Sequence, residues 1–335
     1  MGNKGLLHNL SLSELRQELD AREQELYRGK SKSKISSPLE PRKDLEKYRT
    51  MEIVNAVRSH EKVIYGVDDR VDIFELKNDE IRSIADSVVA LFGANRIRDN
   101  GDGTSTLRTE EFLINLSGQD IKPCQTEKFR NQPVGAFCSG FLVAPNVIAT
   151  AGHCLNAGNF HTVKFVFDYR MENKNNINLS IENKNIYNAI GIIDWVLDRN
   201  GPDWALVELD REVKGREPLT LRTQGKITLN DELFVIGHPM GLPQKYADQA
   251  KVTDNDPKDY FTANLDTYGG NSGSAIVNKE TLEVEGILVR GQTDFVLASR
   301  SSNCAVSLII PAGSDKGEDV TRIENIVSSL RKYTN

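Results

Sequence analysis

The chain has 335 residues, of which 39% are hydrophobic and 27% charged, and its formal net charge is -6. This length allows two domains, or one double-barrel unit with an extension, around a sizeable core. The mild acidity argues against a general nucleic-acid surface, and no apolar run approaches the length of a membrane span. Neither nucleic acid nor a membrane is therefore expected as a partner.

The amino terminus carries no recognisable address. The first ten residues lack the apolar segment of a secretory signal. The chain begins Met-Gly, but Leu6 stands where a myristoylation motif requires Ser or Thr. Taken as written, the sequence predicts a cytoplasmic protein, or a secreted one if a signal has been removed.

The first 62 residues predict a helical extension. A capping-box pattern at residues 11–14 precedes leucines at roughly helical spacing up to about residue 28. A Lys- and Ser-rich stretch, residues 29–37, has the composition of a flexible linker, and a second helical pattern follows from residue 43 to about 60. This extension either packs loosely on the body of the protein or docks a partner.

From residue 63 onward the apolar pattern alternates, as in strands. Residues 99–103, Asp-Asn-Gly-Asp-Gly, predict a hairpin turn, since a calcium loop would need a glutamate at a fixed downstream spacing. Strands are expected over residues 137–151 (two, turning at Pro145), 161–169, 204–209, 233–237, 260–265, 275–277 and 284–289, followed by a helical tail at 318–333. Many short strands closed by a helix predict a mostly-β protein with two antiparallel barrels.

Residues 269–274, Gly-Gly-Asn-Ser-Gly-Ser, have the pattern of a nucleophile loop. Flanking glycines permit a tight turn that presents the Ser272 hydroxyl beside backbone N–H groups. Alone, the pattern would equally fit a surface turn. Upstream, however, Thr-Ala-Gly-His-Cys supplies His153 and Asp-Trp-Ala-Leu-Val supplies Asp203, and a serine nucleophile needs a base and a group that orients the base.

The order His153, Asp203, Ser272 in these three contexts resembles the chymotrypsin-like serine proteases, most closely their bacterial glutamyl-endopeptidase (V8-like) branch. The resemblance covers residues 63–335 and implies a double six-stranded antiparallel β-barrel with a C-terminal helix. The implied boundaries are 1–62 for the extension, about 63–215 and 216–316 for the two barrels, and about 318–333 for the helix.

The same resemblance implies peptide-bond hydrolysis on a protein or peptide substrate through an acyl-enzyme. Ser272 would be the nucleophile, His153 the base and Asp203 the group that orients it, while the N–H groups of Gly270 and Ser272 would form the oxyanion hole. No metal or organic cofactor is expected. The alternative is a catalytically silent protease fold that binds partners through its helical extension.

The specificity pocket is also inferred from the resemblance. Asp266 and Thr267 would lie near its base, and the strand that carries Leu288 and Arg290 would form its wall. Glutamate-specific relatives have a histidine where Leu288 stands, so a carboxylate at P1 would lack a charged partner. A buried aspartate suits a basic P1 residue, although Arg290 would oppose one. The sequence thus predicts cleavage after Lys or Arg.

The segment from Val63 resembles the mature amino terminus of V8-like proteases, which predicts a pro-segment cut after Lys62. The alternatives are an uncut domain boundary and a regulatory partner bound to residues 1–62. One departure concerns activation: trypsin-like zymogens hold the new amino terminus with an aspartate, whereas Asn271 precedes the nucleophile here. A neutral amide cannot form that ion pair.

Four cysteines allow three disulfide connectivities. The resemblance places a bridge between Cys138 and Cys154, whereas a reducing cytosol would favour free thiols. Cys124 and Cys304 remain unassigned from the sequence.

Overall fold

In the computed structural model, the described residues are two near the amino terminus and a series of longer segments. They are Glu18, Ala21 and residues 41–48, 68–116, 118–155, 158, 160–198, 201–229, 231–267, 269–290, 295–299, 303–308 and 317–334. The predicted helix at 11–28 lies outside them except for Glu18 and Ala21, which are both helical. Of the predicted stretch 43–60, the structure describes residues up to 48, including the 3₁₀ turn η1 (Lys43–Leu45). The expected cleavage pair Lys62–Val63 lies outside the described residues.

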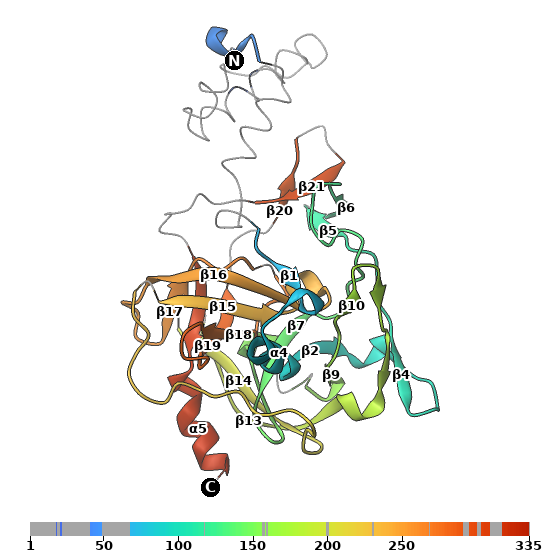
Figure 1. Ribbon diagram of the computed structural model, residues 1–335, viewed down its shortest axis with the longest axis vertical. Helices are drawn as coiled ribbons and strands as arrows, with labels where there is room; N and C mark the ends of the chain where they lie inside the picture. The colour runs from blue at the N-terminus through green and yellow to red at the C-terminus, as the bar shows by residue number, and fades with distance from the viewer. Residues whose placement is uncertain are drawn as a thin grey trace. The chain divides into compact units, whose positions relative to one another are not determined.

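The chain divides into two compact units. One contains Val67–Leu113, Lys128–Gln292 and Ser314–Asn335, and it holds both barrels (Figure 1). The other contains Met1–Gly66, Ile114–Glu127 and Thr293–Gly313. No helix among the described residues is long and apolar enough to cross a membrane.

The first barrel is a closed ring of six antiparallel strands in the order β13-β14-β8-β7-β2-β9. Its interior is apolar, with Val89, Leu91 and Phe141 fully buried. The strands are β2 (Val88–Gly93), β7 (Cys138–Ala144), β8 (Val147–Thr150), β9 (Val163–Val166), β13 (Ile186–Leu197) and β14 (Asp203–Leu209).

The second barrel is also a ring of six, because β16 pairs with β17 as well as with β15. Its strands follow the order β16-β15-β18-β19-β22-β17, all antiparallel, around the fully buried Phe261 and Ile276. They are β15 (Glu232–Gly237), β16 (Lys245–Asp254), β17 (Tyr260–Ala263), β18 (Ala275–Asn278), β19 (Val284–Arg290) and β22 (Glu318–Arg322). The predicted double six-stranded barrel is confirmed.

The predicted helix at 318–333 is wrong at its start. Residues Glu318–Arg322 form β22, which pairs with β17 on one side and β19 on the other and so closes the second barrel. The α-helix α5 begins at Glu324 and ends at Thr334. The strand therefore lies beyond the expected barrel limit of 316. Its pairing on both edges buries Glu318 and Arg322, which read as surface residues in a helical pattern.

The barrel unit also contains smaller elements that belong to neither six-stranded ring. The turn expected at 99–103 joins β3 to β4 in a hairpin, with positive φ at Gly101 and Gly103, as predicted. The remaining elements are α4 (Asp79–Asp86), β1 (Val71–Asp72), β3 (Ile97–Asp99), β4 (Thr104–Leu107), β10 (Met171–Asn173), β11 (Asn176–Ile177), β12 (Ser180–Glu182) and the 3₁₀ turns η2 (Ile73–Glu75), η3 (Ala94–Arg96), η5 (Phe160–Thr162), η6 (Asn183–Asn185) and η7 (Pro239–Gly241).

A buried ion pair fastens β1 to the second barrel. Lys245 Nζ donates to Asp72 Oδ1 at 2.6 Å, to Gln132 Oε1 at 2.8 Å and to the carbonyl oxygen of Pro243 at 2.7 Å. Burial lowers the pKa of Lys245 to about 8, against the opposing effect of the Asp72 carboxylate. The ammonium group is therefore fully hydrogen-bonded, which is the condition under which a buried charge is tolerated.

The second unit contains a four-stranded sheet in the order β20-β21-β6-β5. Its strands are β5 (Ile114–Leu116), β6 (Gln119–Pro123), β20 (Phe295–Leu297) and β21 (Cys304–Ser307), and β21 runs parallel to β6. A disulfide joins Cys124 to Cys304 beside this parallel pair. A second disulfide, in the barrel unit, joins Cys138 to Cys154.

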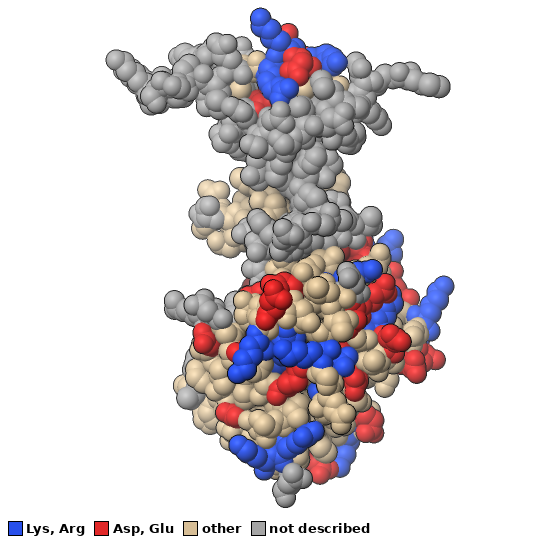
Figure 2. All heavy atoms as spheres, turned by 90° about the vertical axis from the view of Figure 1, so that its left-hand side faces the viewer, with Lys and Arg blue, Asp and Glu red and all other residues tan. Residues whose placement is uncertain are grey.

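Figure 2 shows charges of both signs on one face of the protein. On the face drawn in Figure 2, Lys and Arg side chains are interspersed with Asp and Glu side chains.

Candidate active site

His153 and Asp203 are joined by two hydrogen bonds. The Asp203 carboxylate accepts the backbone N–H of His153 at Oδ1 (3.0 Å), and its Oδ2 lies 2.7 Å from Nδ1 of the ring. The aspartate side chain is 4% exposed and the histidine side chain 37%. A buried carboxylate at Nδ1 fixes the tautomer that carries its proton there, so Nε2 is left as the basic nitrogen.

Local structure explains how these two residues meet. His153 lies in the 3₁₀ turn η4 (Gly152–Cys154) directly after β8, and Asp203 is the first residue of β14. Strand β14 pairs with β8 in a register that places Ala205 opposite Thr150. The start of one strand and the turn after the other therefore lie at the same end of the first barrel.

The backbone of Asp203 is fixed from the second barrel. Its N–H donates to Thr321 Oγ1 at 3.0 Å, and the Thr321 hydroxyl donates to the Asp203 carbonyl oxygen at 3.2 Å. Thr321 is fully buried in β22. Sequence reasoning missed this residue because it treated residues 318–322 as helix.

The Ser272 loop lies against the strands that lead to His153. The Ser139 N–H donates to the Ser272 carbonyl oxygen at 2.8 Å. Gly273 has a φ of 88°, and a Cβ there would lie 2.1 Å from the Ser139 carbonyl oxygen and 2.3 Å from Thr150 Oγ1. A glycine is required here by both the conformation and the close approach to β7 and β8.

The Ser272 backbone and the His153 ring both lie beside the Cys138–Cys154 disulfide. Cys154 Sγ lies 3.7 Å from the Ser272 carbonyl oxygen, and a ring nitrogen of His153 and both sulfurs of the Cys138–Cys154 bridge lie within 4.8 Å of one another. Both sulfurs are bonded to each other, so they are not thiolates, the form in which cysteine binds metals. Among the described residues, no hydrogen bond joins the Ser272 hydroxyl to His153.

Two backbone N–H groups of the loop have no acceptor among the described residues. The Gly269 carbonyl oxygen accepts the Met240 N–H at 2.5 Å. In a trans peptide the N–H points opposite to the C=O, so the Gly270 N–H points away from Met240. Within the described part of the chain, the N–H groups of Gly270 and Ser272 donate to no protein acceptor. Both are therefore available to a developing oxyanion.

Two buried polar residues support the loop from behind. His238 is 1% exposed, and its ring Nδ1 lies 3.1 Å from the Leu242 carbonyl oxygen. The backbone N–H of His238 donates to Ser139 Oγ at 2.9 Å. The Ser139 hydroxyl in turn donates to the Gly270 carbonyl oxygen at 3.2 Å. Burial lowers the pKa of His238 to about 3, so it stays neutral. No role was predicted for His238 from the sequence.

Asn271 is the second of these residues. It is 3% exposed, its Oδ1 accepts the Ser274 hydroxyl at 3.4 Å, and its carbonyl oxygen accepts the Ser274 N–H at 2.8 Å. The side chain thus bonds within its own loop.

The expected pocket residues separate into two groups. Leu288, which is 3% exposed, lies beside the loop: its carbonyl oxygen accepts the Gly273 N–H at 2.7 Å, and its N–H donates to the Ser274 carbonyl oxygen at 3.1 Å. Arg290 ends β19, and its side chain is outside the described set. Asp266 and Thr267 are both buried.

Asp266 is not an isolated carboxylate. Its side chain interacts with that of Asp69, whose Oδ2 accepts the Asp248 N–H at 3.1 Å. Burial raises the pKa of Asp69 to about 6, with a smaller contribution from the negative charge of Asp248 and in opposition to the interaction with Asp266. Asp69 and Asp266 therefore share a site in which a proton is readily held.

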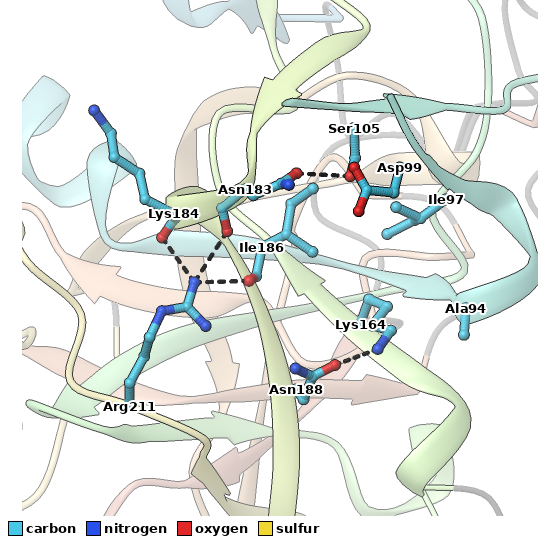
Figure 3. Close-up of a pocket in the computed structure, with 10 residues that line it drawn as sticks. All are labelled: Ala94, Ile97, Asp99, Ser105, Lys164, Asn183, Lys184, Ile186, Asn188 and Arg211. Carbon is cyan, nitrogen blue, oxygen red and sulfur yellow. Dashed lines mark hydrogen bonds between the residues drawn. The ribbon is translucent and has the colours of Figure 1, made fainter. Parts of the chain in front are cut away.

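A cavity of about 540 Å³ on the first barrel is separate from these residues (Figure 3). Its cationic side chains are already paired: Arg211 Nη2 donates to the carbonyl oxygens of Asn183, Lys184 and Ile186, and Lys164 donates to Asn188. None of the three predicted catalytic residues lines it.

Comparison with known proteins gives a match to one family over part of the chain. Residues 138–287 match the sequence model of the trypsin-like peptidase domain. Among solved structures, a Glu endopeptidase in complex with MPD shares 16% sequence identity with a TM-score of 0.44, covering 81% of this chain and 98% of its own. No curated protein matches the chain. Over residues 138–287, which include His153, Asp203 and Ser272, the chain is similar to trypsin-like peptidases.

Proposed function

We propose that the chain is a serine endopeptidase in which Ser272 is the nucleophile, His153 the general base and Asp203 the group that orients the base. The observation that carries the proposal is the two-point hydrogen bonding between His153 and Asp203 beside the Ser272 loop. The match of residues 138–287 to a peptidase domain supports the reaction class.

In the proposed reaction, His153 Nε2 takes the proton of the Ser272 hydroxyl as its oxygen bonds to the substrate carbonyl carbon. The N–H groups of Gly270 and Ser272 receive the resulting oxyanion, each contributing about 3–4 kcal/mol in enzymes of this kind. The imidazolium then protonates the leaving amine and the C–N bond breaks. Water, deprotonated by the same base, hydrolyses the acyl-enzyme and restores the serine.

For specificity, we propose cleavage after Lys or Arg. Leu288, beside the loop, offers no charge to a P1 carboxylate, whereas the buried Asp266 offers a negative charge to a P1 cation. The shared site of Asp266 and Asp69 weakens this charge when a proton is bound there. A panel of peptides that vary at P1 tests it: best turnover after Glu, or after large apolar residues, would contradict the proposal.

Residues 1–62 are proposed to restrain the enzyme, either as a pro-segment removed after Lys62 or as the docking site of a regulatory partner. Since Asn271 is neutral and bonds within its own loop, an ion pair with a new Val63 amino group is unavailable to it. Deletion of residues 1–62 is expected to change activity, and equal activity of the intact and shortened chains would contradict this role.

The two disulfides favour an oxidising compartment over the cytoplasm that the amino terminus predicts, since disulfides persist where thiols are not kept reduced. Thiol counting on protein isolated from its natural source, denatured without reductant, tests this. No free thiol is expected, and four free thiols would favour the cytoplasm.

The central experiment treats the purified protein with a fluorophosphonate probe and measures intact mass. We expect one adduct that is lost in Ser272→Ala, and turnover reduced by about 10⁴-fold in Asp203→Asn, where the amide favours the wrong histidine tautomer. An adduct confined to a chain beginning at Val63 would identify a zymogen. No adduct on either form would favour a silent protease fold that acts by binding.

A further inference from the structure

The peptide unit that joins Gly152 to His153 is held at both ends. Its N–H donates to Asp203 Oδ1 at 3.0 Å, and its carbonyl oxygen accepts the indole Nε1–H of Trp195 at 2.8 Å. The same carbonyl oxygen accepts the Leu155 N–H of its own 3₁₀ turn at 3.2 Å. A planar peptide whose N–H and C=O groups are both hydrogen-bonded has little freedom to rotate. Because the Cα atom of His153 is bonded to this peptide, the peptide limits the orientation of the His153 side chain.

Trp195 is itself fixed by a chain of contacts. It lies in β13 opposite Ala205 of β14, just beyond a register shift between Ile192 and Asp194. The backbone N–H of Trp195 donates to Asp194 Oδ1 at 2.9 Å, and Asp194 Oδ2 accepts the hydroxyl of Ser329 from α5. The position of the indole beside η4 therefore depends on the register shift in β13 and on the contact of this strand with the C-terminal helix α5.

The turn η4, which carries His153, packs tightly against β13. A Cβ at Gly152 would lie 2.3 Å from the Val196 carbonyl oxygen and 3.0 Å from Asp203 Oδ1. Within the described residues, the Asp203 carboxylate accepts hydrogen bonds from His153 and from no other residue. The orientation of the imidazole thus depends on that of the Gly152–His153 peptide, and the carboxylate has no further donor to hold it in place.

We infer that Trp195 is a positioning residue for His153, which acts by donating its indole N–H to the Gly152 carbonyl oxygen. The inference deepens the proposed peptidase function and rests on it for its kinetic consequence, while its geometric consequence is independent of turnover. Trp195 is 40% exposed, an unusual state for so large an apolar ring, and its hydrogen bond gives a reason for the ring to stay at this place.

The test compares Trp195→Phe, which keeps an aromatic ring and loses the donor, with Ile190→Ala on the same strand. Ile190 is 56% exposed and lies far along β13 from η4. The first readout is the strongly downfield proton resonance of the His153 Nδ1–H···Asp203 hydrogen bond, which needs no substrate. The second is the separate measurement of kcat and KM, together with the rate of fluorophosphonate labelling of Ser272.

In Trp195→Phe we expect the resonance to broaden or disappear, kcat and the labelling rate to fall by about tenfold, and KM to stay within about twofold, as for loss of one orienting hydrogen bond. Ile190→Ala should match the wild type in every readout. An unchanged resonance with unchanged kcat would overturn the inference. A rise in KM alone would also overturn it, because it would make Trp195 a substrate contact.

If Trp195→Phe does not fold, a second variant takes its place in the test. In it, 3-benzothienylalanine replaces Trp195, which preserves the ring shape and removes the N–H. The same results are expected of it. If the wild type forms no fluorophosphonate adduct, the proposed function fails, and the resonance in the two Trp195 variants still decides whether the indole positions His153.

Discussion

His238 predicts a specific loss of stability in mild acid. The ring is buried, its Nδ1 lies 3.1 Å from the Leu242 carbonyl oxygen, and it stacks on Tyr169 with the ring centroids 5.7 Å apart. Burial lowers its pKa from 6.5 to about 3. Below pH 6.5, His238 therefore binds a proton in the unfolded chain but not in the folded chain. The contribution of neutral His238 to the free energy of unfolding is fully present above pH 6.5 and is lost as the pH falls toward 3.

The size of this loss follows from the two pKa values. Between pH 7 and pH 5, linkage through His238 alone removes about 2 kcal/mol from the free energy of unfolding. Asp69 acts in the opposite direction, because its raised pKa lets the folded chain hold a proton below about pH 6. This contribution is common to the wild type and to any variant at His238, so it cancels from their difference.

The assay is urea unfolding at pH 7 and pH 5, followed by circular dichroism, in a Ser272→Ala background that prevents self-digestion. His238→Asn keeps an amide donor near the place of Nδ1 and cannot be protonated in this range. We expect the wild type to lose about 2 kcal/mol more than His238→Asn between the two pH values. The control His161→Asn, at an exposed histidine, should behave as the wild type. Equal losses in the wild type and His238→Asn would refute the reasoning.

Two further substitutions test the loop and the buried ion pair. In Gly273→Ala, the new Cβ meets the Ser139 carbonyl oxygen, so Ser272 labelling should be lost, whereas Gly215→Ala, with positive φ but open space, should cost only about 1–2 kcal/mol in unfolding and label normally. Lys245→Met leaves the Asp72 carboxylate buried without its partner and should cost about 3–5 kcal/mol; adding Asp72→Leu should restore most of this in urea unfolding, and no recovery would contradict the pairing.

The sequence predicted the two-barrel fold because many of its strand and turn signals are local. Glycines beside Ser272 mark the tight loop, and Asn-Gly with Asp-Gly at residues 99–103 marks a hairpin that the structure contains. The strands β13 and β16 were not predicted. Neither strand alternates regularly between buried and exposed residues over its whole length, and this alternation is the signal by which a strand is recognised.

Long-range pairing explains the other omissions. Residues Glu318–Arg322 contain charged side chains at spacings compatible with a helix, and only their two partner strands make them a barrel strand. Cys124 and Cys304 are separated by 180 residues, and four cysteines do not reveal which connectivity a fold selects. The contact between Trp195 and the Gly152 carbonyl oxygen likewise depends on a bulge that no local pattern announces.

The bond between Thr321 and Asp203 has a consequence for synthesis of the protein. Asp203 and Ser272 both leave the ribosome before β22 does, yet β22 supplies the hydroxyl that holds the Asp203 backbone and the strand that closes the second barrel. A nascent chain that ends before residue 318 has neither. The Asp203 backbone and the second barrel therefore reach their final arrangement only after the last barrel strand has been synthesised.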